Sequence, residues 1–319
     1  MNLRQVPLLA ALLVAGAALG ADIESAKPVT AREAVGWKLF FDPILSRPKN
    51  FSCSSCHLPD KGWESGVALA EGAHGDLLPR HVPTVVNLDE AEFFFWDGRA
   101  ESLEEQAKGP IANPIELDLK LDEAVARVSA EPHYRKAFAA LGVKRISIDD
   151  IVGAIADFER RLVTGEAAFD RWLQGDRSAL SEAQNRGRMT FFTTGQCALC
   201  HIGRNFTDGD FHNIGTATEE DKGRYAVTKD EAEMGMFKTP SLRNWKGREP
   251  FMHDGRFATL RDVVDFYSEP QDSGIGETEI DPLELGDDEK ADLLSFMEAL
   301  NGPWPDLKPF ETAWRKLVE

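Results

Sequence analysis

The 319-residue chain is poor in cysteine, in positive charge and in the patterns typical of β-strands. All four cysteines fall in two short motifs, so none is left for a structural disulfide. No stretch alternates polar and apolar residues convincingly, which argues against a sheet-based fold. Lys and Arg number 36 against 54 Asp and Glu, for a formal net charge of −18. This acidity argues against nucleic acid as a partner and favours a basic protein.

Only one stretch of the chain is long and apolar, and it covers residues 6–19 behind Arg4. It is too short to span a bilayer, the small residues Ala18 and Gly20 lie at its end, and polar Asp22 comes soon after. This pattern predicts a secretory signal peptide over residues 1–20, with a retained anchor helix as the alternative. We therefore expect a periplasmic protein whose mature chain has no membrane span.

The cysteines lie in two copies of one five-residue motif, CSSCH at 53–57 and CALCH at 197–201. In each copy the cysteines can form thioethers to the vinyl groups of one haem, and the histidine can bind its iron. The alternatives are a zinc site, which needs four ligands close together, and a redox dithiol, which does not need the histidine. We predict two covalently bound haem c groups, attached through Cys53, Cys56 and His57 and through Cys197, Cys200 and His201.

The two halves of the chain repeat each other at an offset of 157 residues. Residues 83–103 and 240–260 share eight identical positions without a gap, and both contain the tripeptide Asp-Gly-Arg. We therefore predict one cytochrome c domain in each half, spanning residues 21–165 and 166–319, with a boundary near 165–175.

Helices are expected between the motifs. Capping residues and apolar periodicity predict helices running from Thr30 toward Phe41, over 147–173, from Ser181 through Phe191, over 260–267 and over 286–300, the last as the C-terminal helix. The expected fold is all-α, with two c-type cytochrome domains, long connecting loops and little β-structure.

The repeat also indicates which residues could lie opposite the histidine on the other face of each haem. Tyr267 ends a predicted helix, and the residue at the same place in the first half is Pro110. If Tyr267 is an iron ligand rather than an ordinary core tyrosine, the first haem has no equivalent ligand and leaves room for a molecule such as peroxide. Gln106 and Glu116 lie near Pro110 in a predicted Pro- and Gly-containing loop. Unless it is a solvated surface group, Glu116 could move a proton between the two oxygens of hydrogen peroxide.

Four segments carry a family resemblance: FWDGR at 95–99, LEEQA at 103–107, GPI at 109–111 and HDGRFATL at 253–260. They resemble the bacterial di-haem cytochrome c peroxidases and the related methylamine-utilisation (MauG-like) di-haem oxidases. The resemblance extends over about residues 30–300.

The resemblance implies roles for individual residues. Glu116 would be the catalytic carboxylate, Gln106 its hydrogen-bonding neighbour, and Trp96 the aromatic bridge for electrons between the haems. Position 267 is methionine in the peroxidases and tyrosine in the MauG-like oxidases. A thioether ligand raises haem potential, whereas a phenolic oxygen stabilises higher-valent iron. Tyr267 therefore favours the MauG-like branch.

Two features depart from the family pattern. The family often holds calcium by an asparagine and backbone carbonyls, but the asparagine position is His81 here, and the carbonyls belong to Arg248 and Pro250. Calcium prefers oxygen ligands and histidine offers none, so the sequence does not decide whether a calcium ion is bound here. His74 is either a ligand that caps the resting first haem or a simple loop histidine. His212 belongs to a familiar family motif without an assigned role.

Together these features predict a periplasmic enzyme that activates hydrogen peroxide at the N-terminal haem and draws electrons through the C-terminal haem. The electrons would come from side chains of a partner protein, as in the MauG-like branch, or from a small periplasmic redox protein, as in a peroxidase. The alternative is a di-haem electron carrier without catalysis. Pro110, Gln106 and Glu116 argue against the carrier.

Overall fold

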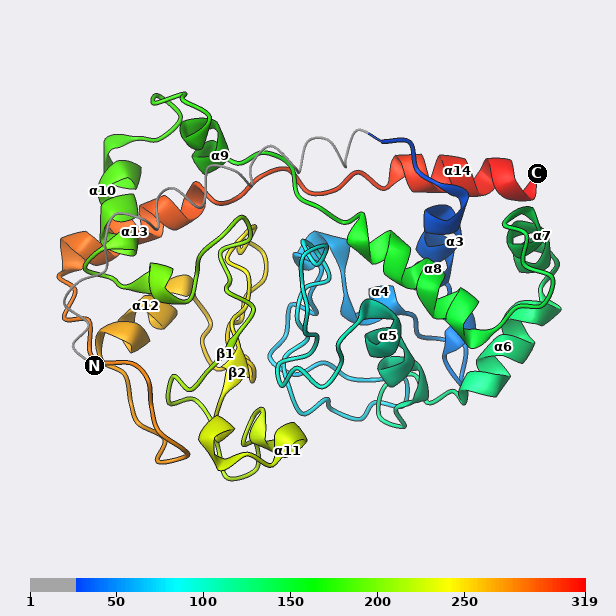
Figure 1. Cartoon of the computed structure of the whole chain (residues 1–319), viewed down its shortest axis with the longest axis horizontal. Coiled ribbons are helices and arrows are strands. Elements are labelled where there is room, and N and C mark those ends of the chain that lie inside the picture. Colours follow the sequence, from blue (N-terminus) through cyan, green and yellow to red (C-terminus); the bar gives the residue numbers. More distant parts are fainter. Residues whose placement is uncertain (1–26) are drawn as a thin grey trace. The chain divides into compact units, whose positions relative to one another are not determined.

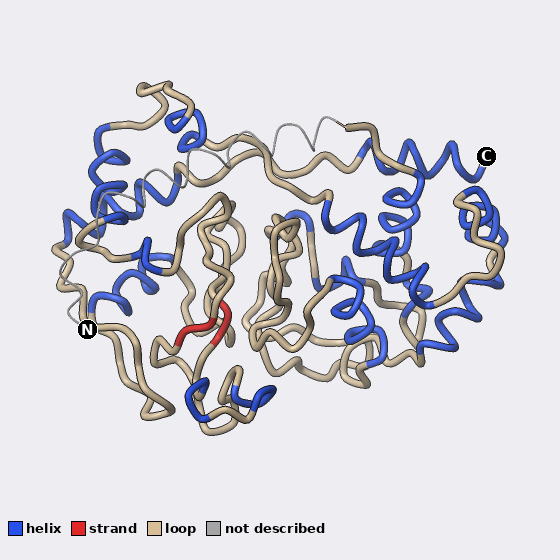
Figure 2. Tube along the Cα trace, in the orientation of Figure 1, coloured by secondary structure: helices blue, strands red, loops and turns tan. Residues whose placement is uncertain are grey.

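The computed structural model describes residues 27–319, and the predicted signal peptide lies outside them. Within these residues the chain is helices and loops, apart from one short antiparallel pair of strands, β1 (Phe211–His212) and β2 (Phe237–Lys238), as Figure 2 shows. The prediction of a mainly helical chain with little β-structure is confirmed. Residues 27–319 include no helix that is both long and apolar enough to cross a bilayer.

The described chain forms two compact units. The N-terminal unit contains residues 27–163, 247–258 and 305–319, and the C-terminal unit contains residues 164–246 and 259–304. The predicted boundary at residue 165 is close to the break between Val163 and Thr164. However, the predicted division gave everything after 165 to the second domain, whereas the structure returns two later segments to the N-terminal unit. Sequence order alone gives no sign of this return.

The N-terminal unit contains the first CxxCH motif, whose cysteines lie in the short helix α4, Cys53–Cys56 (Figure 1), and the unit is mainly helical. Its helices are α3 (Ala31–Phe41), α4, α5 (Leu103–Ala112), α6 (Leu121–Ala130), α7 (Pro132–Ala140), α8 (Ile148–Arg160) and α14 (Lys308–Val318), with short 3-10 turns η1 (Pro43–Leu45) and η2 (Pro59–Lys61).

Capping explains where α3 and α8 begin. The Glu33 amide donates to Thr30 Oγ1 at 3.2 Å while the Thr30 amide donates to Glu33 Oε2 at 2.7 Å, a reciprocal capping box. Ser147 and Asp150 cap α8 in the same way. Both predicted helix starts are confirmed. However, α8 ends at Arg160, so the prediction of one helix over 147–173 is wrong.

The last helix, α14, was missed by the sequence prediction, which took 286–300 as the C-terminal helix. Phe310 and Trp314 lie one turn apart on α14 and are 4% and 8% exposed. The Phe310 ring meets Phe158 of α8 edge-on, with ring centroids 5.1 Å apart. Burial in the N-terminal unit stabilises this helix, because 11 residues alone are too few for a stable isolated helix.

The C-terminal unit is built around the second CxxCH motif. Its elements are α9 (Ala168–Leu173), α10 (Glu182–Phe192), η3 (Cys197–Leu199), β1, α11 (Tyr225–Thr228), η4 (Glu231–Glu233), β2, α12 (Leu260–Ser268) and α13 (Asp287–Glu298). Ser181 caps α10 as predicted. Phe191 of α10 packs on Phe296 of α13, with ring centroids 5.4 Å apart.

The internal repeat is visible in the loop backbone. Phe94 pairs with Ala100 in an isolated β-bridge, and Phe251 pairs with Phe257 at the same offset of 157. Three pairs of residues at this offset also share left-handed backbone conformations, namely Asn87 and Asn244, Phe95 and Met252, and Gly98 and Gly255. Sequence repeat and backbone repeat therefore agree.

Candidate functional site

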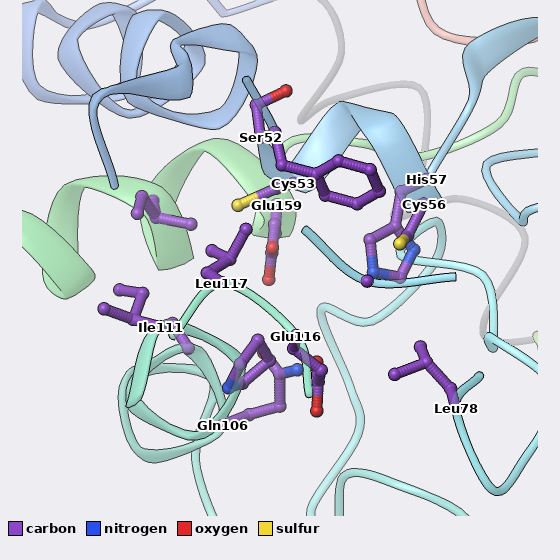
Figure 3. A pocket seen from close by; sticks show the side chains of 15 residues that line it. Ser52, Cys53, Cys56, His57, Leu78, Gln106, Ile111, Glu116, Leu117 and Glu159 are labelled. Carbon is purple, nitrogen blue, oxygen red and sulfur yellow. The ribbon is translucent and has the colours of Figure 1, made fainter. Parts of the chain in front are cut away.

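A cavity lies in the N-terminal unit beside the first motif (Figure 3). Its lining includes the predicted residues Cys53, Cys56, His57, Gln106, Pro110 and Glu116, together with Phe51, Ser52, Gly72, Leu78, Ala107, Ile111, Leu117, Ile155 and Glu159. The structure therefore gathers the first CxxCH motif and the predicted peroxide-side residues around one space.

The tautomer and the neutral charge of His57 suit it to bind a metal through Nε2. Its Nδ1 lies 3.2 Å from the backbone carbonyl oxygen of Trp63. A carbonyl only accepts hydrogen bonds, so Nδ1 carries the proton and the lone pair of Nε2 stays available. Burial lowers the pKa of His57 to about 4, which keeps the imidazole neutral at neutral pH.

The donor set of this cavity fits a covalent haem. Cys53 and Cys56 are not paired in a disulfide, and both thiols border the cavity next to the neutral imidazole of His57. Cys53 and Cys56 would carry the thioethers and His57 would bind the iron.

Gln106 and Pro110 lie on α5, not in a loop, so that prediction is wrong. Ser102 begins the helix by accepting a hydrogen bond from the Glu105 amide, and the helix continues to Ala112 with Pro110 inside its last turn. Proline brings no amide donor and no side-chain ligand to the cavity wall. The loop that the sequence predicted begins only after α5.

The loop after α5 folds back over the end of the helix. The amides of Leu117 and Leu119 donate to the carbonyls of Pro110 and Ile111 at 3.1 and 2.8 Å. These bonds satisfy carbonyls that a helix end leaves free. They also bring Glu116 to the cavity wall.

Glu116 is held from two sides. Asn113 Nδ2 donates to Glu116 Oε1 at 2.7 Å, and the Ala73 amide donates to the Glu116 carbonyl at 2.8 Å. Gly72 permits this approach, since any side chain there would collide with the Ile115 carbonyl. Burial raises the pKa of Glu116, although Asn113 and Arg99 oppose the rise. Asn113 was not predicted from the sequence, where its only signal was an amide side chain three residues before Glu116.

Glu159 of α8 was also missed. It is 4% exposed, it lines the cavity, and its Oε2 has no hydrogen-bond partner among residues 27–319. Burial raises its pKa to about 8. The available signal was a glutamate four residues after Ile155, on the face of the helix that was predicted to be apolar.

His74 does not line this cavity. Its Nε2 lies 3.0 Å from Asp118 Oδ2, and its side chain is 40% exposed. The structure therefore does not bring His74 to the first motif, and we do not propose it as an iron ligand.

The second motif repeats the arrangement of the first. His201 Nδ1 lies 2.9 Å from the carbonyl oxygen of Phe206, and burial lowers the pKa of His201. Cys197 and Cys200 are not paired in a disulfide. These three residues therefore also fit a covalent haem.

Tyr267 lies near the end of α12 and is half-buried. Burial, together with the neighbouring Cys197 and Cys200, raises the pKa of its hydroxyl group. Its hydroxyl makes no hydrogen bond within the part of the chain that is described. These features are compatible with the predicted iron ligand.

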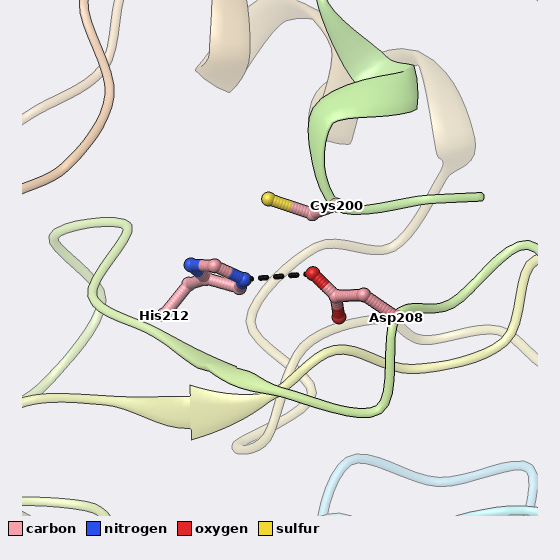
Figure 4. A group of neighbouring side chains, drawn as sticks. All are labelled: Cys200, Asp208 and His212. Carbon is pink, nitrogen blue, oxygen red and sulfur yellow. Dashed lines mark hydrogen bonds and ion pairs between the residues drawn. The ribbon is translucent and has the colours of Figure 1, made fainter. Parts of the chain in front are cut away.

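His212 of β1 is clamped between two carboxylates. Its Nε2 lies 2.9 Å from Asp208 Oδ2 (Figure 4), and its Nδ1 lies 2.7 Å from Glu279 Oε2. Both nitrogens face acceptors, so the ring is a cation. Donor atoms of Cys200, Asp208 and His212 lie within 4.8 Å of one another. We assign no metal site to them, because the imidazole nitrogens are protonated and Cys200 belongs to the haem motif.

Trp96 and His81 lie together in the N-terminal unit. The Trp96 indole Nε1 donates to the His81 carbonyl at 2.8 Å. The His81 and Arg248 side chains both bind Glu64, at 2.9 and 2.7 Å. His81 and Arg248 are two of the positions at which the family resemblance implied a calcium site, whose presence in this chain the sequence left undecided.

Comparison with known proteins identifies the class. The family model for the di-haem cytochrome c peroxidases matches residues 30–178. The methylamine utilization protein MauG of Methylorubrum extorquens is 41% identical over 281 residues, covering 86% of this chain and 80% of that protein. The cytochrome c551 peroxidase of Nitrosomonas europaea is 36% identical over 296 residues, covering 90% and 86%.

A solved structure agrees. The crystal structure of a MauG-like protein associated with microbial copper homeostasis matches with a TM-score of 0.78 at 31% identity, covering 86% of this chain and 91% of that one. The chain belongs to the di-haem cytochrome c peroxidase and MauG family. It is therefore a haem-dependent oxidoreductase of the peroxidase class.

Proposed function

We propose that this protein is a periplasmic enzyme that reduces hydrogen peroxide at the N-terminal haem with two electrons that pass through the C-terminal haem. In the balanced reaction, one peroxide, two electrons and two protons give two molecules of water. The electrons come from side chains of a partner protein, in the MauG-like manner.

One observation carries this proposal. The cavity lined by Cys53, Cys56 and His57 is also lined by Gln106, Pro110 and Glu116, and its described lining contains no methionine and no histidine besides His57. When bound there, the haem would supply redox-active iron. A haem face without a protein ligand would let a small oxidant reach the iron, which an electron carrier with two closed haems does not need.

The residues around this space have defined tasks. Glu116, with its raised pKa, takes a proton from peroxide and returns it to the departing oxygen. Asn113 fixes one carboxylate oxygen of Glu116, which leaves the other free for this transfer. Gln106 contributes an amide that can hydrogen-bond peroxide or Glu116. Trp96 conducts electrons toward the first haem.

Tyr267 favours the partner-protein source of electrons. A phenolic ligand at the second haem lowers its reduction potential relative to a thioether, so that a typical high-potential cytochrome c becomes a poor donor. Tyr267→Met should raise the potential of this haem in a redox titration and increase cytochrome c oxidation. An unchanged potential would mean that Tyr267 is not an iron ligand.

The second candidate is a peroxidase that takes electrons from a small redox protein. The net charge of −18 favours it, since an acidic enzyme attracts a basic cytochrome.

One experiment separates the candidates: peroxide is added to the oxidised protein with and without reduced cytochrome c, followed by visible spectroscopy. The MauG-like enzyme should react with peroxide and oxidise cytochrome c slowly. A kcat/KM for cytochrome c on the order of 10⁵ M⁻¹s⁻¹ or more would establish the peroxidase instead. Two low-spin haems that do not react with peroxide would establish a carrier.

A further inference from the structure

A cluster of three charged side chains is buried beside Trp96, and we call it the Glu64 cluster. Its members are Glu64, His81 and Arg248, which are 3%, 3% and 9% exposed. Charged groups are rarely buried so completely unless they are paired, and here all three are linked by hydrogen bonds.

The hydrogen bonds define the charges of this cluster. His81 Nε2 lies 2.9 Å from Glu64 Oε2, and His81 Nδ1 lies 3.0 and 3.1 Å from the carbonyl oxygens of Val67 and Ala68. All of these partners are acceptors, so both ring nitrogens carry protons and His81 is a cation. Burial alone lowers the pKa of His81, but the hydrogen bond and charge of Glu64 raise it overall.

Arg248 supplies a second cation. Its Nε donates to Glu64 Oε1 at 2.7 Å, so each oxygen of Glu64 is bound to a different cation. The stem of Arg248 lies directly against Gly62, where any side chain would collide with Arg248 Cγ. Gly62 also has a left-handed backbone, with φ of 64°. The arginine can therefore approach this closely because residue 62 is glycine.

This arrangement does not fit a calcium ion. Calcium needs about six to eight oxygen ligands, with carboxylates among them. Here both oxygens of the Glu64 carboxylate are engaged, and His81 presents N–H groups where the family has an asparagine oxygen. Two buried cations at this place would also repel a divalent cation.

The Glu64 cluster is linked to Trp96 through the backbone of His81. The His81 carbonyl accepts the hydrogen bond from the Trp96 indole at 2.8 Å, and the His81 amide donates to the His253 carbonyl at 2.7 Å. The His253 ring meets the Trp96 ring edge-on, with centroids 6.4 Å apart. Holding His81 in place therefore holds both the carbonyl that accepts the hydrogen bond of Trp96 and the backbone of His253, whose ring lies against the indole.

We propose that the Glu64 cluster takes the structural place of calcium in this protein and positions Trp96 without a metal ion. His81, Glu64 and Arg248 are positioning residues in this proposal. The importance of Trp96 for electron transfer rests on the proposed function, but independence from calcium does not.

The first test measures calcium in the purified di-haem protein. We expect well under one calcium per chain by elemental analysis, no heat on titration with calcium chloride, and the same Tm with 1 mM calcium or 1 mM EDTA. One tightly bound calcium per chain whose removal lowers the Tm would overturn the proposal. This result does not depend on peroxide activity, so it is separable from failure of the proposed function.

The second test follows the hydrogen bond of Trp96 by ultraviolet resonance Raman difference spectra against Trp96→Phe. The hydrogen-bond-sensitive indole band should shift in His81→Asn, which leaves one cation and one anion in the cluster. It should also shift in Arg248→Met and return toward the wild-type position in Arg248→Lys. Glu71→Gln, at an exposed site, is the matched control.

We expect EDTA to leave this band unchanged in the wild-type protein. The Tm of His81→Asn should fall by roughly 5 °C or more, because one partner of a buried ionic network is lost. An indole band that responds to EDTA, or that is the same in His81→Asn and wild type, would overturn the proposal. If Arg248→Met does not fold, His81→Asn alone decides the outcome.

Discussion

Two carboxyl groups line the cavity of the N-terminal unit, and their surroundings differ. Glu116 accepts a hydrogen bond from Asn113, whereas Glu159 has an oxygen with no partner among the described residues. Burial raises the pKa of both groups. Glu116 is therefore held in one orientation, as the proposed proton transfer requires, and Glu159 is a neutral acid over much of the acidic and neutral pH range.

Replacing Glu116 by glutamine should slow the reaction with peroxide and leave the haem spectra nearly unchanged. General acid–base assistance is worth about 10²–10⁴-fold, so a loss of this size is expected in stopped-flow measurements. Glu101→Gln, at an exposed position, should have no effect. A loss below about tenfold would remove Glu116 from the mechanism.

Glu159 should make stability depend on pH. Its pKa is about 8 in the folded protein against an ordinary value of 4.5, so the folded state binds the proton more tightly than the unfolded state. The contribution is complete below pH 4.5 and is lost as the pH rises toward 8. The free energy of unfolding should therefore fall by a few kcal/mol over this window, at about 1.4 kcal/mol per pKa unit. Glu159→Gln should remove this part of the fall and so flatten the profile of Tm against pH. Parallel Tm profiles of the two proteins would contradict the assignment.

At the scale of elements, the helix starts follow from local sequence and the helix partners do not. Thr30, Ser147 and Ser181 were recognised because capping depends on residues three positions apart. The helical placement of Gln106 and Pro110 was missed, because Pro110 argued for a loop and packing prevailed over that local preference. Helix α14 was missed because it is stabilised by contacts with residues far away in sequence.

Removing the Phe310 ring should therefore destabilise the protein strongly. This side chain is 4% exposed and packs on Phe158, and Phe→Ala substitutions in cores cost about 3–5 kcal/mol. Phe310→Ala should lower the Tm followed at the first haem, while Lys316→Ala on the exposed face of α14 should not. Equal Tm values for the two variants would show that α14 does not support the N-terminal unit.

At the scale of the whole molecule, each compact unit contains one CxxCH motif. The histidine of each motif is backed by a carbonyl within its own unit, Trp63 for His57 and Phe206 for His201. We therefore expect the two haem sites to form independently.

The double substitution Cys53→Ser and Cys56→Ser should remove one haem and abolish the peroxide reaction, while the second haem stays attached. Intact-mass measurement should show two haems on the wild type and one on this variant. The matched control, Cys197→Ser with Cys200→Ser, should also lose one haem but keep the first. A wild-type mass with any other number of haems would contradict the assignment of both sites.

The sequence by itself determined the two haem-attachment motifs, the internal repeat and the starts of α3, α8, α10, α12 and α13. These features depend on residues close together in the chain, or on the direct comparison of its two halves. Only the tertiary structure decided that residues 247–258 and 305–319 pack with the N-terminal unit, that Asn113 holds Glu116, and that Glu64 lies between His81 and Arg248. Contacts such as Glu64 to Arg248 join residues 184 positions apart, and no local pattern reports a partner so distant.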